Sequence, residues 1–163
     1  MKQKLIILSG SPCVGKTAVA EELFEANENC GYLDGDWVWR FNPFSLNDPR
    51  LRNGDKNISF VLSTYLNSDF EYVIFSSVVA TDITIRETIL RDITAKDYIT
   101  IGFTLTCSEE TLVERCKKRG DDGEISFYWL HLDPYPNDFV INTDNKTIEQ
   151  IVFEIKSIVD THT

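Results

Sequence analysis

Residues 10–17 read GSPCVGKT, and they directly follow the apolar run LIILS at residues 5–9. The stretch matches every defined position of the pattern G-x-x-x-x-G-K-[ST]. From Lys16 to Ala26 the apolar residues recur at helical spacing, so the local order is strand, loop and helix. Glycines in such a loop allow the backbone to turn around a phosphate. The stretch therefore predicts a phosphate-binding loop, and a glycine-rich turn without a ligand is the alternative.

The residues of this loop have different expected roles in binding ATP. Backbone N–H groups and the helix N-terminus supply positive potential. Lys16 reaches the β- and γ-phosphates, and the Thr17 hydroxyl ligates Mg²⁺. The Cys13 thiol is either activated by the helix N-terminus and Lys16 or simply a small side chain that fits the loop, and we favour the second interpretation. The predicted nucleotide-binding residues are Gly10, Ser11, Pro12, Cys13, Val14, Gly15, Lys16 and Thr17.

Outward from the loop, strand and helix patterns alternate along the whole chain. Strands are expected at residues 4–9, 31–34, 71–77, 98–106 and 138–142. Helices are expected at residues 16–26, 58–66, 82–93 and 109–118, and from Thr147 onward. This alternation predicts an α/β fold with a parallel sheet and helices on both faces. With no internal repeat, residues 1–163 are expected to form one domain, with its ligands at the carboxyl ends of the strands.

Composition and charge exclude several classes of function. Lys and Arg number 16 against 26 Asp and Glu, a net charge of −10 that argues against binding a nucleic acid polymer. No apolar run approaches the ~20 residues of a membrane span, and the one near the N-terminus is too short for a targeting signal, so we expect a cytoplasmic protein. The four cysteines show no C-x-x-C spacing, and the two histidines cannot build a zinc site with them.

Two carboxylates follow the second expected strand in the sequence LDGD, at Asp34 and Asp36. One of them can hold Mg²⁺ or accept a proton from an attacking hydroxyl, while the other binds a polar acceptor, and this division stays open. Arg40 lies one helical turn beyond Asp36 and can pair with an anionic acceptor. The alternative is a plain Asp-Gly turn with solvated charges.

Two arginines, Arg115 and Arg119, lie one turn apart near the end of the fourth expected helix and on one of its faces. Guanidinium groups in this position can stabilise the charge on a transferring phosphoryl group. The alternative is a solvated basic helix end, because Lys117 and Lys118 lie there as well.

The segment 120–136 lacks periodicity and is rich in Asp, Gly, Pro and aromatic residues. We interpret it as a lid that excludes water from the reaction. Its aromatic side chains either stack on a base and cover the acceptor, or pack the lid onto the core; they are Phe127, Tyr128, Trp129 and His131.

The third expected strand ends in FSSVV at residues 75–79, without the Asp that commonly supports the metal at this position. Either Ser76 or Ser77 substitutes through water, or Asp34 takes the magnesium role.

Together these motifs resemble the small P-loop kinase family, which includes nucleoside monophosphate, shikimate, gluconate and adenylylsulfate kinases and chloramphenicol phosphotransferase. GSPCVGKT resembles the phosphate loop, LDGD the carboxylates that bind acceptor and magnesium, and residues 106–119 the lid arginine segment. The resemblance spans nearly the whole chain. It implies a three-layer P-loop NTPase fold with a five-stranded parallel sheet of order 2-3-1-4-5.

The resemblance also implies an activity: transfer of the ATP γ-phosphoryl group to the hydroxyl or phosphate of a small molecule. By analogy Asp34 matches the magnesium or base carboxylate, and Asp36 with Arg40 matches the acceptor contacts, within a region of about 35–66. The chain lacks the glycine triplet of shikimate kinases and the D-G-x-P-R stretch of nucleoside monophosphate kinases. The acceptor therefore stays open, as does the choice between a monomer and a homodimer.

The sequence leaves two other functions to compare with phosphoryl transfer. Residues 145–148 (NKTI) imitate the start of the guanine-reading motif N-K-x-D of GTPases, but the fourth position is Ile148 and no D-x-x-G occurs in the chain. A nucleotide-binding regulatory ATPase without a phosphoryl acceptor is the main alternative, and the missing Asp of the third strand supports it.

Overall fold

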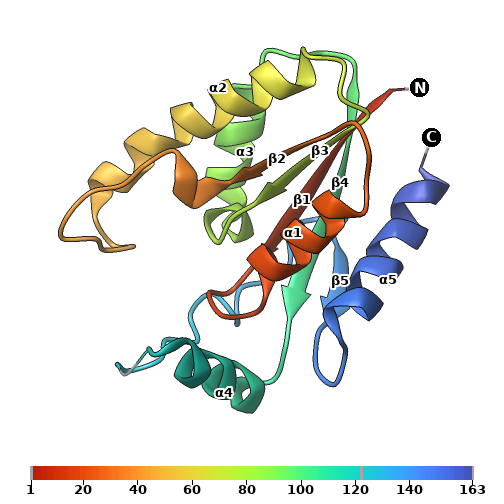
Figure 1. Cartoon of the computed structure of the whole chain (residues 1–163). Coiled ribbons are helices and arrows are strands. Elements are labelled where there is room, and N and C mark those ends of the chain that lie inside the picture. The colour runs from red at the N-terminus through yellow and green to blue at the C-terminus, as the bar shows by residue number, and fades with distance from the viewer. Residues whose placement is uncertain (1, 122, 163) are drawn as a thin grey trace.

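The computed structural model describes residues 2–121 and 123–162, in which strands and helices alternate (Figure 1). The strands are β1 (Gln3–Gly10), β2 (Cys30–Asp34), β3 (Tyr72–Ser76), β4 (Tyr98–Thr106) and β5 (Phe139–Asn142). The helices are α1 (Lys16–Glu25), α2 (Asp55–Leu66), α3 (Ile83–Arg91), α4 (Glu109–Arg119) and α5 (Ile148–Thr161). Short 3-10 turns at Gly35–Trp37, Pro49–Gly54 and Val79–Thr81 complete the regular structure.

All five strands are parallel, and their order in the sheet is β2-β3-β1-β4-β5. The predicted fold class and the strand order 2-3-1-4-5 are therefore confirmed. The carboxyl ends of the strands meet at one edge of the sheet, next to the phosphate loop, while both chain ends lie toward the opposite edge (Figure 1).

The sheet is covered on both faces, which is why its central strands are nearly continuous apolar runs. In β1, Leu5 and Ile7 pack toward α2 and α3, whereas Ile6 and Leu8 pack toward α1 and α5. All four side chains are at most 1% exposed. The two helix layers are visible on either side of the sheet in Figure 1, with α4 beyond its carboxyl edge.

Helix ends follow the capping signals of the sequence. Thr147 and Gln150 form a capping box at the start of α5, and the Ser108 hydroxyl accepts a hydrogen bond from the backbone N–H of Thr111 at the start of α4. Except at one helix, the boundaries agree with the sequence prediction to within two residues. Helix α2 begins at Asp55 rather than at Ile58, because the preceding 3-10 turn leads directly into it.

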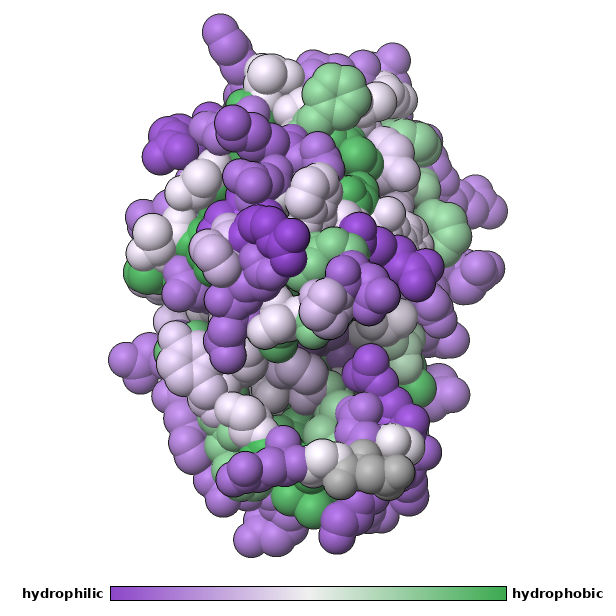
Figure 2. Space-filling model, turned by 90° about the vertical axis from the view of Figure 1, so that its left-hand side faces the viewer, coloured by the Kyte–Doolittle hydropathy of each residue, from purple (hydrophilic) through white to green (hydrophobic). Residues whose placement is uncertain are grey.

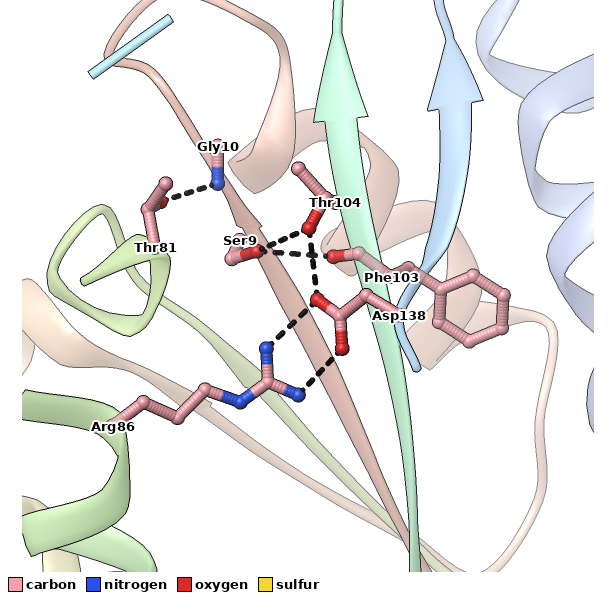
Figure 3. A network of polar contacts seen from close by, with 7 residues as sticks. All are labelled: Ser9, Gly10, Thr81, Arg86, Phe103, Thr104 and Asp138. Atoms are coloured by element: carbon pink, nitrogen blue, oxygen red, sulfur yellow. Dashed lines mark hydrogen bonds and ion pairs between the residues drawn. The ribbon is translucent and has the colours of Figure 1, made fainter. Parts of the chain in front are cut away.

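A buried ion pair ties α3 to the sheet below the site (Figure 3). Both guanidinium NH₂ groups of Arg86 donate to the Asp138 carboxylate at 2.8 Å, and each side chain is 2% exposed. The Thr104 hydroxyl donates to the same carboxylate at 2.8 Å. Gly102 on β4 makes the pair possible, because a Cβ atom there would overlap the Asp138 carboxylate and the Arg86 guanidinium. Tyr135 covers the guanidinium, with 3.9 Å between Cζ and the ring centroid.

Within the described residues, no helix combines the length and the apolar character needed to cross a membrane.

Candidate active site

A cavity of about 700 Å³ opens at the carboxyl edge of the sheet. Figure 2 shows a recess in the middle of the face on this side, with hydrophilic side chains around much of its rim. The cavity is lined by Pro12, Cys13, Gly15, Lys16, Thr17, Ala18, Glu21, Asp34, Asp36, Phe44, Leu46, Ser76, Ser77, Val78, Arg115 and Arg119. The structure thus brings most of the site residues predicted from sequence to one place.

The phosphate loop joins β1 to α1 in a conformation with left-handed backbone angles. Gly15, with φ of 106°, stands immediately before the first turn of α1, where a residue with a Cβ atom would be strained. Cys13 has φ of 65°, which is uncommon for a residue with a side chain. The Lys16 ammonium folds back over the loop and donates to the carbonyl oxygens of Gly10 (2.9 Å) and Ser11 (2.8 Å).

The backbone N–H of Gly10 is already used within the protein, because it donates to the Thr81 hydroxyl at 2.8 Å. Thr81 lies in the 3-10 turn after β3 and is 3% exposed. It therefore fixes the start of the phosphate loop. The next residue, Asp82, is the N-cap of α3, and its carboxylate accepts a hydrogen bond from the backbone N–H of Ile85.

The predicted magnesium pair lies together in the structure. Thr17 Oγ1 donates to Asp34 Oδ2 at 3.1 Å, and Asp34 is 7% exposed at the end of β2. The Tyr32 hydroxyl (3.4 Å) and the backbone N–H of Asp36 (2.9 Å) also donate to the Asp34 carboxylate. These contacts orient one carboxylate oxygen beside a hydroxyl, both of the hard oxygen type that Mg²⁺ prefers.

Burial shifts the pKa values of a lysine and an aspartate in the cavity. Burial lowers the pKa of Lys16 to about 8, against the opposing attraction of Asp36 and Asp34. The pKa of Asp36 is raised, first by desolvation of its carboxylate at the cavity wall and then by the nearby charge of Asp34. A raised pKa makes Asp36 a stronger base than an ordinary surface carboxylate.

The two arginines of α4 differ in their surroundings. Arg115 Nη1 donates to the carbonyl oxygen of Val14 (2.9 Å) and to the Thr143 hydroxyl (2.8 Å), so Arg115 holds the phosphate loop against the end of β5. Arg119 is exposed at the cavity rim, and its Nη1 lies 3.9 Å from Cys13 Sγ. Arg119 is therefore the more available of the two for a transferring phosphoryl group.

Not every predicted residue lines the cavity. Arg40 is exposed and is absent from its lining among the described residues. At the end of β3, the Ser76 hydroxyl is hydrogen-bonded to the Tyr32 hydroxyl at 3.1 Å, and Ser77 Oγ accepts from the backbone N–H of Val79. Both serines face the cavity, so a supporting role through water stays a prediction for them, as does an acceptor contact for Arg40.

The predicted lid 120–136 includes residue 122, which lies outside the described residues. Some aromatic side chains of this segment pack against the protein, and others are exposed. Phe127 packs against the core beside α4, whereas Tyr128 is 59% exposed. His131 stacks on Phe127 and its Nε2 lies 2.6 Å from Glu109 Oε1. Trp129 lines a second cavity under the lid, of about 320 Å³.

A family model described as AAA domain matches residues 6–128, which is more than half of the chain. No curated protein matches the sequence.

Several solved structures share the fold. The tunicamycin resistance protein of Deinococcus radiodurans is 15% identical with a TM-score of 0.67, and the match covers 98% of this chain and 96% of that one. A gluconokinase from Sinorhizobium meliloti 1021 is 17% identical with a TM-score of 0.66, covering 99% and 98%. The Mycobacterium tuberculosis APS kinase CysC, in complex with AMPPNP and APS, is 16% identical with a TM-score of 0.65, covering 98% of both chains. The resemblance to P-loop kinases is thereby confirmed, and identities this low show the shared fold alone.

Proposed function

This chain belongs to the AAA domain family. We propose that it is an ATP- and Mg²⁺-dependent phosphotransferase. It would move the γ-phosphoryl group of ATP to a hydroxyl or phosphate of a small molecule. One observation carries the proposal: Lys16, Thr17, Asp34, Asp36 and Arg119 line a single cavity at the carboxyl edge of the sheet. In this proposal Lys16 is the cation for the donor phosphates, and Thr17 with Asp34 is the magnesium pair. Asp36 is the base, and Arg119 is the second cation.

On the donor side, the loop N–H groups and Lys16 would bind the phosphates, and Thr17 with Asp34 would hold Mg²⁺. When bound there, Mg²⁺ would neutralise part of the negative charge on the β- and γ-phosphate oxygens. Arg119 would stabilise the charge that spreads over the transferring group. The bound nucleotide analogue named for the APS kinase neighbour supports a nucleotide as donor.

On the acceptor side, Asp36 would accept the proton of the attacking hydroxyl, because its raised pKa suits a general base. A small pocket of about 30 Å³ adjoins the main cavity and shares Asp36, Phe44 and Ser77 with it. This volume accommodates one small polar group rather than a ring. The acceptor is therefore expected to present such a group beside its reacting hydroxyl.

The chemistry of the small pocket indicates which group this is. Trp39 Nε1 and Arg52 Nη1 line it, are buried, and have no hydrogen-bond partner among the described residues. Arg52 Nη1 lies 3.5 Å from Asp55 Oδ2, which is too long for a good hydrogen bond. Buried N–H donors without partners are costly, so an oxygen-rich ligand group would satisfy both. We propose a carboxylate or phosphate of the acceptor as that group.

The proposed function is tested by mixing the chain with ATP, Mg²⁺ and a panel of hydroxylated acids, sugars and sugar phosphates. ADP release that depends on an acceptor, with one phosphorylated product identified by mass spectrometry, is the expected result. Slow ATP hydrolysis that is the same with and without every acceptor would instead support the regulatory ATPase, for which the missing carboxylate at the end of β3 is the supporting observation.

Replacement of Arg52 by Gln is expected to raise the acceptor KM by about 10- to 100-fold and to leave the ATP KM within twofold. The reason is the loss of one charge-assisted hydrogen bond, worth about 1.5–3 kcal/mol. Steady-state kinetics with the best acceptor measures this. Arg50→Gln is the matched control, because Arg50 lies in the same turn but is exposed and pairs with Asp48. Equal effects of the two variants, or an effect on ATP alone, would contradict the acceptor assignment.

The lowered pKa of Lys16 predicts a pH dependence of ATP binding. Below pH 8 the ammonium is charged and binds phosphate, and above pH 8 the free protein loses that charge. We expect the dissociation constant of an ATP analogue to be flat below pH 8 and to rise by up to about tenfold per pH unit above it. Isothermal titration from pH 6.5 to 9.5 measures the profile. Lys16→Arg, which stays charged, should remove the alkaline rise; a rise that persists in Lys16→Arg assigns it to another group.

A further inference from the structure

Three potential metal ligands meet at the phosphate loop: one from the loop itself and two from the end of α4. Cys13 Sγ, Cys116 Sγ and a carboxylate oxygen of Asp121 all lie within 4.8 Å of one another. The Cys13 thiol donates to Asp121 Oδ2 at 3.4 Å. The other two thiols, Cys30 and Cys107, belong to no such group within residues 2–121 and 123–162. The sequence gives no hint of this cluster, because neither cysteine has a partner at metal-site spacing.

The backbone fixes all three ligands in place. Cys13 is held at positive φ in the phosphate loop, and Cys116 is 5% exposed on α4. At the end of α4, the N–H of Gly120 donates to Lys117 O and the N–H of Asp121 donates to Cys116 O, at 3.0 and 3.1 Å. This pair of bonds is a Schellman cap, and it positions Asp121 directly after the helix whose last turns carry Cys116.

We infer that Cys13, Cys116 and Asp121 form a binding site for one Zn²⁺ or a similar thiophilic divalent cation. Two thiolates and a carboxylate are zinc ligands, and the thiolates disfavour Mg²⁺ and Ca²⁺. Zinc–sulfur and zinc–oxygen bonds of about 2.3 and 2.1 Å place tetrahedral ligands roughly 3.5–3.8 Å apart. The Cys13 and Asp121 ligand atoms are already at about this distance, and no pair of ligand atoms needs to approach by more than roughly 1.3 Å.

The fourth ligand position is open to a water molecule. All three ligands also line the second cavity of about 320 Å³ beneath the lid, where Trp129 forms part of the wall. Binding forms two metal–sulfur bonds and one metal–oxygen bond, and it breaks bonds between the hydrated cation and water molecules, which leave. Two S–H bonds also break, and their protons pass to solvent. No electrons are transferred.

Metal binding has to remove the protons of both thiols and to move the Arg119 guanidinium away from Cys13. Burial and the hydrogen bonds with Cys116 and Asp121 raise the pKa of Cys13 to about 12, so the thiol is protonated in the metal-free protein. Arg119, with Nη1 3.9 Å from Cys13 Sγ, has to turn away when the cation enters. An occupied site would therefore change the position of Arg119 at the rim of the main cavity and tie the phosphate loop to the end of α4.

Titration of the reduced full chain with Co²⁺ tests the site without ATP or an acceptor. We expect sulfur-to-cobalt charge-transfer absorption in the near ultraviolet that saturates at one equivalent and disappears when Zn²⁺ is added. Cys13→Ser should abolish this absorption, and Asp121→Asn should weaken Co²⁺ binding at least 10-fold. Cys30→Ser is the matched control, because it removes a thiol outside the cluster, and it should bind as the wild type does.

The variants are chosen so that failure to fold does not obscure the result. Cys13 is in a loop and Asp121 is exposed, and the thermal melting of each variant is recorded beside the titration. No charge-transfer absorption in the folded wild type, or full retention of it in folded Cys13→Ser, overturns the inference. Loss of the absorption in folded Cys30→Ser also overturns the inference, because Cys30 would then be a ligand and the metal would bind elsewhere.

Discussion

Lys16→Ala is expected to lower the turnover number for phosphoryl transfer by about 10²- to 10³-fold, the usual cost of removing one group that stabilises charge in the transition state. The Lys16 ammonium lies over the carbonyl oxygens of Gly10 and Ser11, within the loop that would bind the β- and γ-phosphates. The other described cations that line the main cavity are Arg115, which is bonded to the loop backbone, and Arg119 at the rim. Coupled ADP release at saturating ATP and acceptor measures the loss.

Lys96→Ala is the matched control for this experiment. Lys96 is exposed and lines none of the cavities described above, so the variant should keep the wild-type rate. The melting temperature of Lys16→Ala should stay close to the wild-type value, since the substitution removes a half-buried charge and no core contact. Wild-type turnover in a folded Lys16→Ala protein would show that this loop does not bind the donor phosphates.

Asp138→Ala is expected to reduce the free energy of unfolding by about 3–5 kcal/mol, because it leaves the Arg86 guanidinium buried without its counter-charge. The pair is bidentate, both side chains are 2% exposed, and Thr104 also loses its acceptor. Urea denaturation followed by circular dichroism measures the change. The effect is a large fraction of the stability of an ordinary domain.

Two companion variants show whether the charge is responsible. Replacing both partners, as Arg86→Met with Asp138→Leu, should recover at least half of the loss, since a buried pair exchanged for apolar side chains is often near neutral. Lys118→Ala removes an exposed ion pair with Glu114 and should change stability by less than about 1 kcal/mol. If the double variant is as unstable as Asp138→Ala, packing rather than the unpaired charge explains the result.

Much of the fold was predictable because its signals are local. The strand–loop–helix order around Gly10 to Thr17, the apolar run of β1 and the capping box at Thr147 each lie within a few neighbouring residues. The strand order came from the resemblance to a known family rather than from these patterns. Between the second expected strand and the second expected helix, residues 35–57, the sequence patterns indicated no regular element, yet this segment supplies Trp39 and Arg52 to the small pocket.

The rest of the site depends on contacts between segments that are distant in the chain. Thr81 is hydrogen-bonded to Gly10, Arg115 is hydrogen-bonded to Val14, and Cys13 lies beside Cys116. All three contacts form at the carboxyl edge of the sheet, where segments that follow different strands come together. No spacing in the sequence signals such contacts, because parallel strands bring together residues separated by a whole crossover. The arginine pair illustrates this: the pattern placed Arg115 and Arg119 on one helix face, yet their hydrogen-bond partners differ completely.

The lid is fastened at both of its ends. The Schellman cap at Gly120 fixes the end that leaves α4, and the buried pair of Arg86 with Asp138, covered by Tyr135, fixes the end that enters β5. If the segment acts as the predicted lid, ends held in this way would let it swing as a flap about the line that joins them, without detaching from either one. Its opening would then be a hinge rotation about a fixed axis, and each closure would return the same side chains to the same places over the cavity.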